Sequence, residues 1–265
     1  CVHLTESPAT GSRVRPPVSG AAAGVSGAGA ASSSARIWHD RRTMAHLFDT
    51  SAIHPAALEL GRIFAERGYE LSLVGGPVRD LFLGAEALDL DFTTDATPDQ
   101  ILQTAGEWAD AHWEIGREYG TIGLRKGEAM IEVTTYRAEA YDADSRKPTV
   151  AFGRRLEDDL FRRDFTINSM ALRLPGLELV DPYGGIRDLH AGILRTPGAP
   201  EDSFSDDPLR MMRAARFASR LDVAPAPEVV AAMTDMAERI GIVSAERVRD
   251  ELVLSLIHIS EPTRL

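Results

Sequence analysis

Cysteine is almost absent from this sequence, with Cys1 the single example among 265 residues. One cysteine excludes an internal disulfide framework and a thiolate metal site, and a reducing compartment fits this usage. No apolar run is long enough to span a membrane. Positive charge is also scarce, because 29 Lys and Arg stand against 40 Asp and Glu, a net charge of −11. That balance argues against a protein that coats nucleic acid nonspecifically, so any such contact must be focused in a local basic groove. We predict a cytoplasmic protein without membrane contact.

The two ends of the chain differ from its middle, which has an ordinary globular composition of 44% hydrophobic and 26% charged residues. Residues 1–43 are rich in Ala, Gly and Ser and show no periodic apolar pattern. They cannot bury enough surface to order themselves. We interpret 1–43 as a disordered or non-native extension, with Met44 as the biological start. Residues 255–265 break the preceding helical pattern at Pro262, and we interpret them as a non-native tail on a truncated chain.

A glycine turn follows the first predicted strand, residues 69–74. Gly75 and Gly76 let the backbone approach a phosphate without an intervening Cβ. Residues 78–83 are expected to form a helix whose N-terminus faces this turn. Arg79 lies just inside that helix, where its side chain can reach a phosphate.

An acidic strand comes next. Asp89 and Asp91 alternate with apolar neighbours, the period-2 pattern of a strand with one buried face. Two adjacent carboxylates repel each other and raise each other's pKa, and a divalent cation such as Mg²⁺ relieves that repulsion. The alternative is an ordinary amphipathic edge strand with two solvated aspartates. The string GGPVRD upstream favours a site for a metal-bound nucleoside triphosphate.

The next predicted elements complete a small mixed sheet. A helix is expected over 55–67, a second starts at Thr97 and Pro98, and strands are expected over 113–115, 121–124 and 129–136. In the last strand, Glu132 lies on the face opposite Ile131 and Val133, where it is a candidate third carboxylate of the site. The alternative is a cross-strand ion pair with Arg125. Residues 138–152 are polar and predicted to be a mobile loop.

The string LEDDLFRRDFTINSMALRL occupies residues 156–174. Its apolar positions predict one helical face, interrupted at the charged cluster 162–164 between two short helices. Arg163 offers a fixed fork of donors for triphosphate oxygens. Asp164 can hold Arg163 or cap the following turn. For any one of these residues, the alternative is a solvated charged face.

The rest of the chain is predicted to be mainly helical. A short strand is expected over 178–182, another over 193–195, a loop over TPGAPEDSF, and helices over 206–220, 227–239 and from Ser244 onward. Arg210, Arg213 and Arg216 recur every three residues and so follow one side of a helix, with Asp207 one turn before Arg210 on the same side. Phosphate or base contact, rather than a surface ladder, is the role we favour for Arg213 and Arg216.

Asp207 and Arg210 together can distinguish bases. An aspartate accepts from an exocyclic amine, and an arginine donates to the adjacent ring nitrogen. Cytosine and adenine present this order, whereas uracil and guanine present a carbonyl beside a ring N–H. Each group left unpaired in a dry site costs about 1–3 kcal/mol, enough to select C and A without a nucleic-acid template.

Five ordered motifs over residues 55–254 resemble the class II CCA tRNA nucleotidyltransferases and bacterial poly(A) polymerases of the polymerase-β-like superfamily: GGPVRD with DLD, EVTTYR, RRDFTIN, DPYGGIRDL, and DDPLR with the final helix. The resemblance implies an α/β nucleotidyltransferase head over 44–175 and an α-helical neck over 176–254. It also implies two-metal chemistry on Mg²⁺ held by Asp89 and Asp91, with Glu132 assisting. The residues implied to bind nucleotide are Gly75, Gly76, Arg79, Arg163, Asp207, Arg210, Arg213 and Arg216. Asp206 stands where the family usually has Glu.

The implied activity is addition of C and A, from CTP and ATP, to the 3′ end of tRNA. A poly(A) polymerase is the first alternative. Those enzymes usually carry a doubled basic pair and Phe after the glycine equivalent to Gly116, whereas this chain has REYGT there. A member adding only CC or only A is the second alternative, and a nucleotide-binding fragment without catalysis is the third. In the family, a flexible loop equivalent to 138–152 helps the site change its nucleotide preference.

Overall fold

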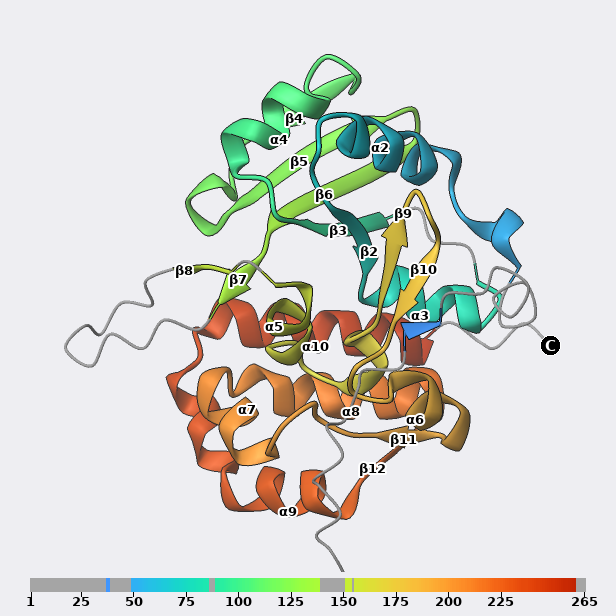
Figure 1. Ribbon diagram of the computed structural model, residues 1–265. Helices are drawn as coiled ribbons and strands as arrows, with labels where there is room; N and C mark the ends of the chain where they lie inside the picture. Colours follow the sequence, from blue (N-terminus) through green and yellow to red (C-terminus); the bar gives the residue numbers. More distant parts are fainter. Residues whose placement is uncertain (1–36, 39–48, 86–88, 139–150, 154, 261–265) are drawn as a thin grey trace, which may run out of the picture. The chain divides into compact units, whose positions relative to one another are not determined.

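The computed structural model describes residues 37–38, 49–85, 89–138, 151–153 and 155–260. In this part, the main sheet has eight strands in the order β1-β10-β9-β2-β3-β6-β5-β4 (Figure 1). Every neighbouring pair is antiparallel except β3 and β6, which are parallel, so the predicted mixed sheet is confirmed. The strands are β1 (Ile37–Trp38), β2 (Leu71–Val74), β3 (Asp89–Thr94), β4 (Ala111–Trp113), β5 (Thr121–Lys126), β6 (Ala129–Thr135), β9 (Ala171–Leu174) and β10 (Glu178–Val180).

Helices α2 (Pro55–Glu66) and α4 (Pro98–Ala105) cover one face of this sheet (Figure 1). Thr97 caps α4 as predicted, and the Gln100 side chain accepts in return from the backbone N–H of Thr97, which completes a capping box. The core beneath the helices includes the alternating residues of β3, Leu90 and Phe92. Because side chains alternate along a strand, burying these two turns the neighbouring aspartates to the opposite face.

Helix α3 (Gly76–Phe82) starts directly from the glycine turn, as expected. Gly75 has a φ of +74°, a conformation that L side chains rarely adopt, which explains why glycine occupies the turn. On the acidic face of the sheet, α5 (Leu156–Phe161) packs through Leu156 and Leu160 against Val74 and its neighbours. The acidic face is therefore bordered by α3 and α5.

The helical prediction for the second half of 156–174 is wrong. After α5 and a 3₁₀ turn at Thr166–Asn168, the chain forms β9, which pairs with β2 on one side and β10 on the other. A short apolar run suits a helix or a strand equally, and here the pairing with two strands decides. The sheet of the head extends to Val180, beyond residue 175.

The region after the sheet is mainly helical, as predicted. Its elements are α6 (Gly185–Ala191), β11 (Ile193–Leu194), α7 (Pro200–Asp206), α8 (Leu209–Leu221), β12 (Ala224–Pro225), α9 (Pro227–Asp235), a 3₁₀ helix (Ala237–Ile242) and α10 (Ala245–Ser260). The expected loop TPGAPEDSF is wrong in its second part, because Pro200 starts α7. The helix expected from 206 instead begins at Leu209, so Asp207 lies between two helices in extended backbone.

Three peripheral predictions meet mixed outcomes. Within 1–43, Ile37–Trp38 pairs with β10, so disorder does not hold for these two residues, and the remainder lies outside the described residues. Helix α10 continues to Ser260, before the break expected at Pro262, and the interpretation of 255–265 as a non-native tail stays a prediction. The ends of the loop at 138–152 pair as β7 (Arg137–Ala138) and β8 (Ala151–Phe152), and 139–150 lie outside the described residues.

Further 3₁₀ turns occur at Thr50–Ala52 and Arg117–Tyr119. No helix among the described residues is long and apolar enough to cross a membrane.

Candidate functional site

Three carboxylates share the face of the sheet opposite α2 and α4. The parallel register places Asp91 of β3 directly opposite Glu132 of β6, and Asp89 lies two residues before Asp91 on the same face. Neighbouring strands are about 4.8 Å apart, so the three side chains lie close together. The ion pair considered between Glu132 and Arg125 is not formed, since Gly123 is the residue of β5 opposite Glu132.

Two of these carboxylates, Asp91 and Glu132, are less easily ionised than ordinary ones. Asp91 keeps an accessible edge, but the walls around it remove part of its hydration. This burial raises its pKa, the charge of Arg163 opposes the rise, and Asp89 adds to it. Loss of hydration also raises the pKa of Glu132, with further increases from Asp91 and Asp89 and a decrease from Arg137. Negative charge is thus concentrated here beyond what the protein neutralises.

The acids suit a cation through their donor chemistry. No hydrogen bond or ion pair to the side-chain carboxylates of Asp89, Asp91 or Glu132 occurs within the described ranges, and hard carboxylate oxygens suit Mg²⁺. Among the residues that the structure describes, no group of three or more His, Cys, Asp and Glu side chains is arranged to hold a metal by itself. Mg²⁺ commonly takes one or two carboxylates and completes its shell with phosphate and water, so the aspartate pair fits such an ion.

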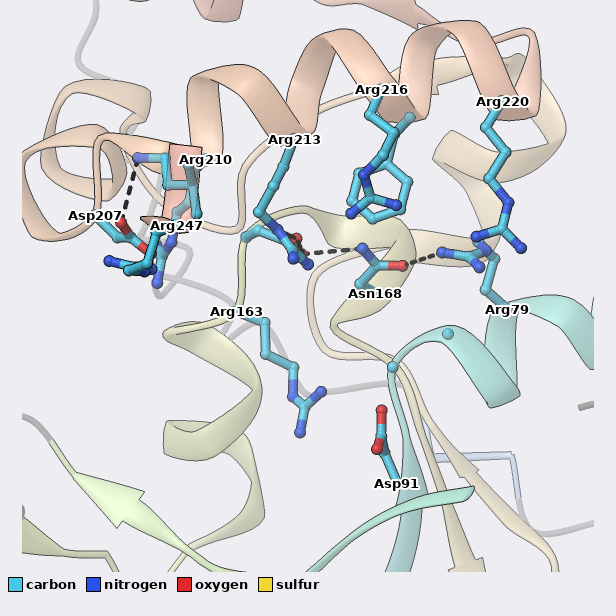
Figure 2. A pocket seen from close by; sticks show the side chains of 15 residues that line it. Arg79, Asp91, Arg163, Asn168, Asp207, Arg210, Arg213, Arg216, Arg220 and Arg247 are labelled. Atoms are coloured by element: carbon cyan, nitrogen blue, oxygen red, sulfur yellow. Dashed lines mark hydrogen bonds and ion pairs between the residues drawn. The ribbon is translucent and has the colours of Figure 1, made fainter. Parts of the chain in front are cut away.

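A cavity of about 430 Å³ joins the end of β3 to helix α8 (Figure 2). Seven arginines and three aspartates line it, a strong local excess of positive charge in a chain of net charge −11. All eight predicted nucleotide-binding residues lie on its wall together with Asp91, whereas Asp89 and Glu132 do not. The lining residues are Gly75, Gly76, Arg79, Asp91, Arg163, Asp164, Asn168, Asp207, Leu209, Arg210, Arg213, Arg216, Phe217, Arg220 and Arg247.

The glycine turn lies against two of these arginines. A Cβ on Gly75 would come within 3.0 Å of Arg163 Nη1, and one on Gly76 within 3.5 Å of Arg79 Nη2. Arg163 is paired with Asp159 of α5 at 3.3 Å, one turn earlier in the chain. Arg79 has a nearly buried side chain that pairs with the adjacent Asp80 at 2.7 Å. Both guanidinium groups are therefore held beside a backbone that leaves room for a ligand.

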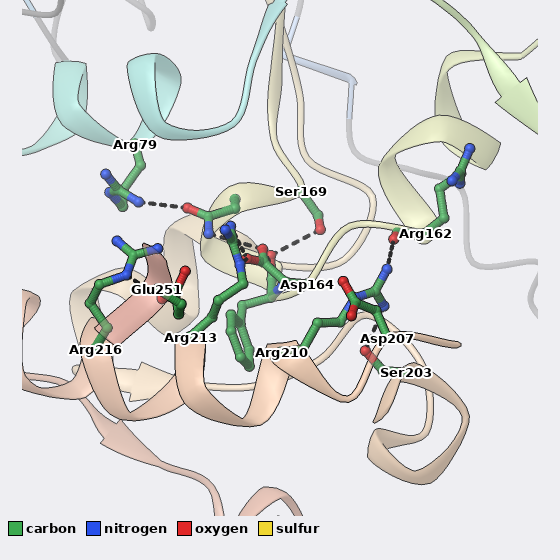
Figure 3. Close-up of polar contacts among 12 residues, drawn as sticks. Arg79, Arg162, Asp164, Ser169, Ser203, Asp207, Arg210, Arg213, Arg216 and Glu251 are labelled. Atoms are coloured by element: carbon green, nitrogen blue, oxygen red, sulfur yellow. Dashed lines mark hydrogen bonds and ion pairs between the residues drawn. The ribbon is translucent and has the colours of Figure 1, made fainter. Parts of the chain in front are cut away.

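Asp164 has a different role from either one considered for it. It does not hold Arg163; its Oδ2 accepts from Nη2 and Nε of Arg213 at 2.6 and 2.8 Å (Figure 3). Its Oδ1 accepts from the backbone N–H of Phe165 and from Asn168 Nδ2. Burial alone would raise the pKa of Asp164, but the charge of Arg213 and these hydrogen bonds lower it below its ordinary value.

Asn168 extends this contact to α3, because its Oδ1 accepts from Arg79 Nη1 at 2.7 Å (Figure 2). Arg79 and Arg213 also lie over the ring of Phe217, at 5.5 and 5.4 Å from its centroid, and Arg216 lies at 4.6 Å. Sequence reasoning missed Asn168 and Phe217. The position of Asn168 within RRDFTIN and of Phe217 beside the arginine repeat were the available signals.

Asp207 and Arg210 both line the cavity but do not pair through their side chains. Arg210 donates from Nη1 to Ser203 Oγ at 2.7 Å and from Nη2 to the carbonyl of Arg162 (Figure 3). Burial lowers the pKa of Arg210, and the charges of nearby acids oppose that decrease. Asp207 instead pairs with Arg247 of α10 at 2.8 Å. Sequence reasoning also missed Arg247 and Arg220.

The remaining arginine of the repeat is buried rather than solvated. Arg216 pairs with Glu251 of α10, and the two side chains are only 8% and 4% exposed. The alternative of a surface ladder is therefore wrong for Arg216. At the junction of the two regions, Asp181 accepts from the backbone N–H groups of Gly185 and Ile186, at the start of α6.

A mixed sheet with paired acids on one face, followed by a helical region that presents arginines to the same cavity, defines a nucleotidyltransferase head and neck. Comparison with known proteins agrees. The family described as "Poly A polymerase head domain" matches residues 71–195, and the one described as "Probable RNA and SrmB-binding site of polymerase A" matches residues 222–258. Residues 71–195 thus resemble this head-domain family, and CCA-adding enzymes are among the relatives that the chain resembles.

Individual relatives support that placement. The CCA-adding enzyme of Levilactobacillus brevis is 42% identical over 71% of this chain and 46% of its own length, and that of Bacillus subtilis is 41% identical over 72% and 47%. The structure of the Bacillus stearothermophilus CCA-adding enzyme in complex with CTP is 35% identical, with a TM-score of 0.68, over 77% of this chain and 49% of that one. The structure of the Thermotoga maritima CCA-adding enzyme complexed with tRNA is 28% identical, with a TM-score of 0.66, over 83% of this chain and 50% of that one. The chain thus spans about half the length of the curated relatives it matches.

Proposed function

We propose that this chain is the head and neck of a template-independent RNA nucleotidyltransferase that adds C and A, from CTP and ATP, to the 3′ end of tRNA. One observation carries the proposal. One cavity has Asp91 of the acidic strand at one side and Asp207 and Arg210 at another, with Arg163 between them (Figure 2). That order matches a nucleoside triphosphate, whose reacting phosphate and base lie at opposite ends of a polyanion.

The chain's own residues divide the work along the substrate. The Gly75–Gly76 turn leaves room for phosphate oxygens, and Arg79 and Arg163 beside it neutralise their charge. Arg213 and Arg216 extend the positive wall toward the base. Because these guanidinium groups are held by internal partners, they need little rearrangement when the substrate arrives.

Base selection falls to Asp207 and Arg210. Only two of the five guanidinium N–H groups of Arg210 are used by Ser203 and Arg162, so donors remain for a ring nitrogen. The carboxylate of Asp207 accepts from the exocyclic amine of cytosine or adenine. Uracil and guanine offer neither group a matching partner on the base, at a cost of about 1–3 kcal/mol for each missing contact.

Mg²⁺ is the cofactor that fits this donor set. Asp89 and Asp91 would hold it, with Glu132 on the neighbouring strand assisting. A cation held there would supply activation of the 3′-hydroxyl and stabilisation of the charge that develops on the phosphate and on the leaving pyrophosphate. Burial raises the pKa values of Asp91 and Glu132, the neighbouring acids raise them further, and a bound cation would offset both effects.

The relatives add substrate classes to the proposal. Structures similar to this chain include CCA-adding enzymes in complex with CTP, with ATP and with tRNA. We extend CTP, ATP and the tRNA 3′ end to this chain as proposed substrates. The same inference places the protein in the cytoplasm, where tRNA is processed.

Incubation of the chain with tRNA that lacks its 3′-terminal CCA, and with one labelled nucleotide at a time, tests the proposal. Incorporation of C, followed by A on the C-extended product, is expected, with little U or G. Long A tracts on unrelated RNA would identify a poly(A) polymerase, and C alone or A alone a CC-adding or A-adding enzyme. Binding of CTP and ATP without incorporation would reduce the chain to a nucleotide-binding fragment.

A further inference from the structure

Both oxygens of the Asp207 carboxylate are engaged. Oδ1 accepts from the backbone N–H of Leu209 at 3.2 Å, at the start of α8. Oδ2 accepts from Nη2 of Arg247 at 2.8 Å, and the Asp207 side chain is 28% exposed. Figure 2 shows Arg247 beside Asp207 at the end of the cavity away from Arg220. Two donors from different helices therefore fix the plane of the carboxylate proposed to read the base.

Arg247 is placed by packing deeper in the neck. Arg247 and Glu251 are four residues apart on α10, so they lie on the same side of that helix. Glu251 forms the buried ion pair with Arg216 of α8, and breaking such a pair leaves an uncompensated buried charge. This pair fixes α10 against α8 one turn beyond Arg247. The contact of Arg247 with Asp207 is thus built into the joint between the two helices.

The orientation of Asp207 matters because a carboxylate can accept from two different groups of a pyrimidine. In one position it accepts from the 4-amino group of cytosine. In a shifted position it can accept from the ring N3–H of uracil, which lies next to the 4-keto oxygen. The terminal torsion of an aspartate is broad and allows such a shift unless a partner restrains it. A fixed carboxylate selects, and a free one accepts both bases.

We propose that Arg247 is a specificity-determining positioning residue, which holds the Asp207 carboxylate where it accepts from an exocyclic amine and rejects uracil. The inference rests on the proposed function, since it concerns base choice in the same cavity. Arg247 acts through Asp207 and need not touch the base. The expected consequence of losing it is acceptance of UTP rather than general loss of nucleotide binding.

Equilibrium binding of CTP and UTP to the chain, by calorimetry in the presence of Mg²⁺, tests this directly. Arg247→Met should lower the CTP-over-UTP preference about tenfold, the size of one charge-assisted contact, mainly by improving the affinity for UTP. Arg247→Lys keeps the charge but loses the planar fork, and should restore part of the preference. Misincorporation of U on tRNA should increase in the same order, with kcat for C within about threefold of the parent.

Arg249→Met is the matched control, because Arg249 lies on the same helix, is 66% exposed and pairs with Asp250 away from the cavity. It should leave the preference unchanged. In a double-mutant cycle, Asp207→Ala should abolish the effect of Arg247→Met. An unchanged preference in Arg247→Met, equal weakening of both nucleotides, or an effect that persists without Asp207 would overturn the inference. Failure of the parent chain to prefer CTP over UTP would instead reject the proposed function.

Discussion

The acids of the sheet and the arginines of α8 are the two sides of the proposed site, and the protein neutralises their charges to different extents. Asp89, Asp91 and Glu132 share a face, and no hydrogen bond or ion pair reaches their carboxylates anywhere in the described chain. Burial, and to a smaller extent the charges of the neighbouring acids, raises the pKa of Asp91 and of Glu132. Arg213 and Arg216, in contrast, are each paired with a buried carboxylate.

This difference indicates which side is ready before the substrate arrives. The arginines are fixed by partners within the fold, so they present an ordered positive wall at little reorganisation cost. The acids are only partly neutralised by the charges of Arg163 and Arg137, and in the proposed reaction a cation that binds with the triphosphate would complete this neutralisation. We infer that affinity for the nucleotide comes largely from the arginine side, and that the chemical step depends on the acidic side.

The largest expected effect is at the acidic side. Asp91→Asn should reduce incorporation by about 10³-fold or more, because the variant loses a charged ligand for the catalytic cation. Single-turnover incorporation of C on tRNA measures it, with nucleotide binding recorded in parallel. Glu128→Gln, an exposed acid in the turn before β6, is the control and should remain fully active. Activity of Asp91→Asn within tenfold of the parent would contradict this division between the two sides.

When no metal is bound to either protein, Asp91→Asn should be more stable than the parent. The pKa of Asp91 is raised in the folded state, so the folded chain binds this proton more tightly than the unfolded chain. Stability therefore decreases as the pH rises through the folded pKa, and ionised Asp91 is destabilising at pH 7. Thermal unfolding at pH 7 with chelator should give a higher midpoint for Asp91→Asn, and a lower midpoint would refute this sign.

On the arginine side, Arg213→Met should cost about 3 kcal/mol of unfolding free energy, because it leaves Asp164 buried without its ion partner. Urea unfolding measures this. The pKa of Asp164 is lowered in the folded state, so the stabilisation is present above about pH 4 and is lost as the pH falls below it. The difference between variant and parent should shrink there. Arg155→Met removes an exposed arginine and should cost below about 0.5 kcal/mol.

A smaller effect is expected at the glycine turn. Gly75→Ala should cost about 1–2 kcal/mol for its positive φ and raise KM for the nucleotide about tenfold, because the new Cβ lies 3.0 Å from Arg163 Nη1. Gly84→Ala is a close control, since Gly84 has a φ of +70° and a Cβ added there would meet no atom within 4 Å. Both variants should lose similar stability, and only Gly75→Ala should lose affinity. Equal KM values would remove Arg163 from the proposed phosphate site.

The smallest effect is expected at Arg220, an exposed residue of the cavity wall with no ion pair within the described ranges. Arg220→Met should weaken nucleotide binding about threefold at low salt and less at high salt, because an exposed charge is screened. Stability should not change. Arg62→Met, on the outer helix α2, provides the comparison and should bind normally. A loss that does not depend on salt would argue that Arg220 makes a direct contact.

Local features of the site could be predicted from the sequence, because their causes lie within a few residues. The alternation around Asp89 and Asp91 predicted one acidic face, and Gly75–Gly76 predicted a turn into a helix. The three-residue repeat of arginines placed Arg210, Arg213 and Arg216 along one cavity wall.

Partners distant in the chain could not be predicted in this way. Asp164 is 49 residues from Arg213, and Asp207 is 40 residues from Arg247, so no local pattern links them. The strand β9 was expected to be helical because its pairing with β2 and β10 is also a long-range contact. The position of Asp207 outside a helix depends on α7, which begins inside an expected loop.

The single parallel pair in the sheet, β3 with β6, has a consequence for how this fold tolerates change. The connection between them contains α4, β4 and β5, and its turns can vary in length without altering which residues face each other. A one-residue insertion inside β6 would instead send Glu132 to the α2–α4 side and Ile131 or Val133 toward water. Length variation among natural or engineered versions should therefore gather in the turns of the crossover and avoid the two strands themselves.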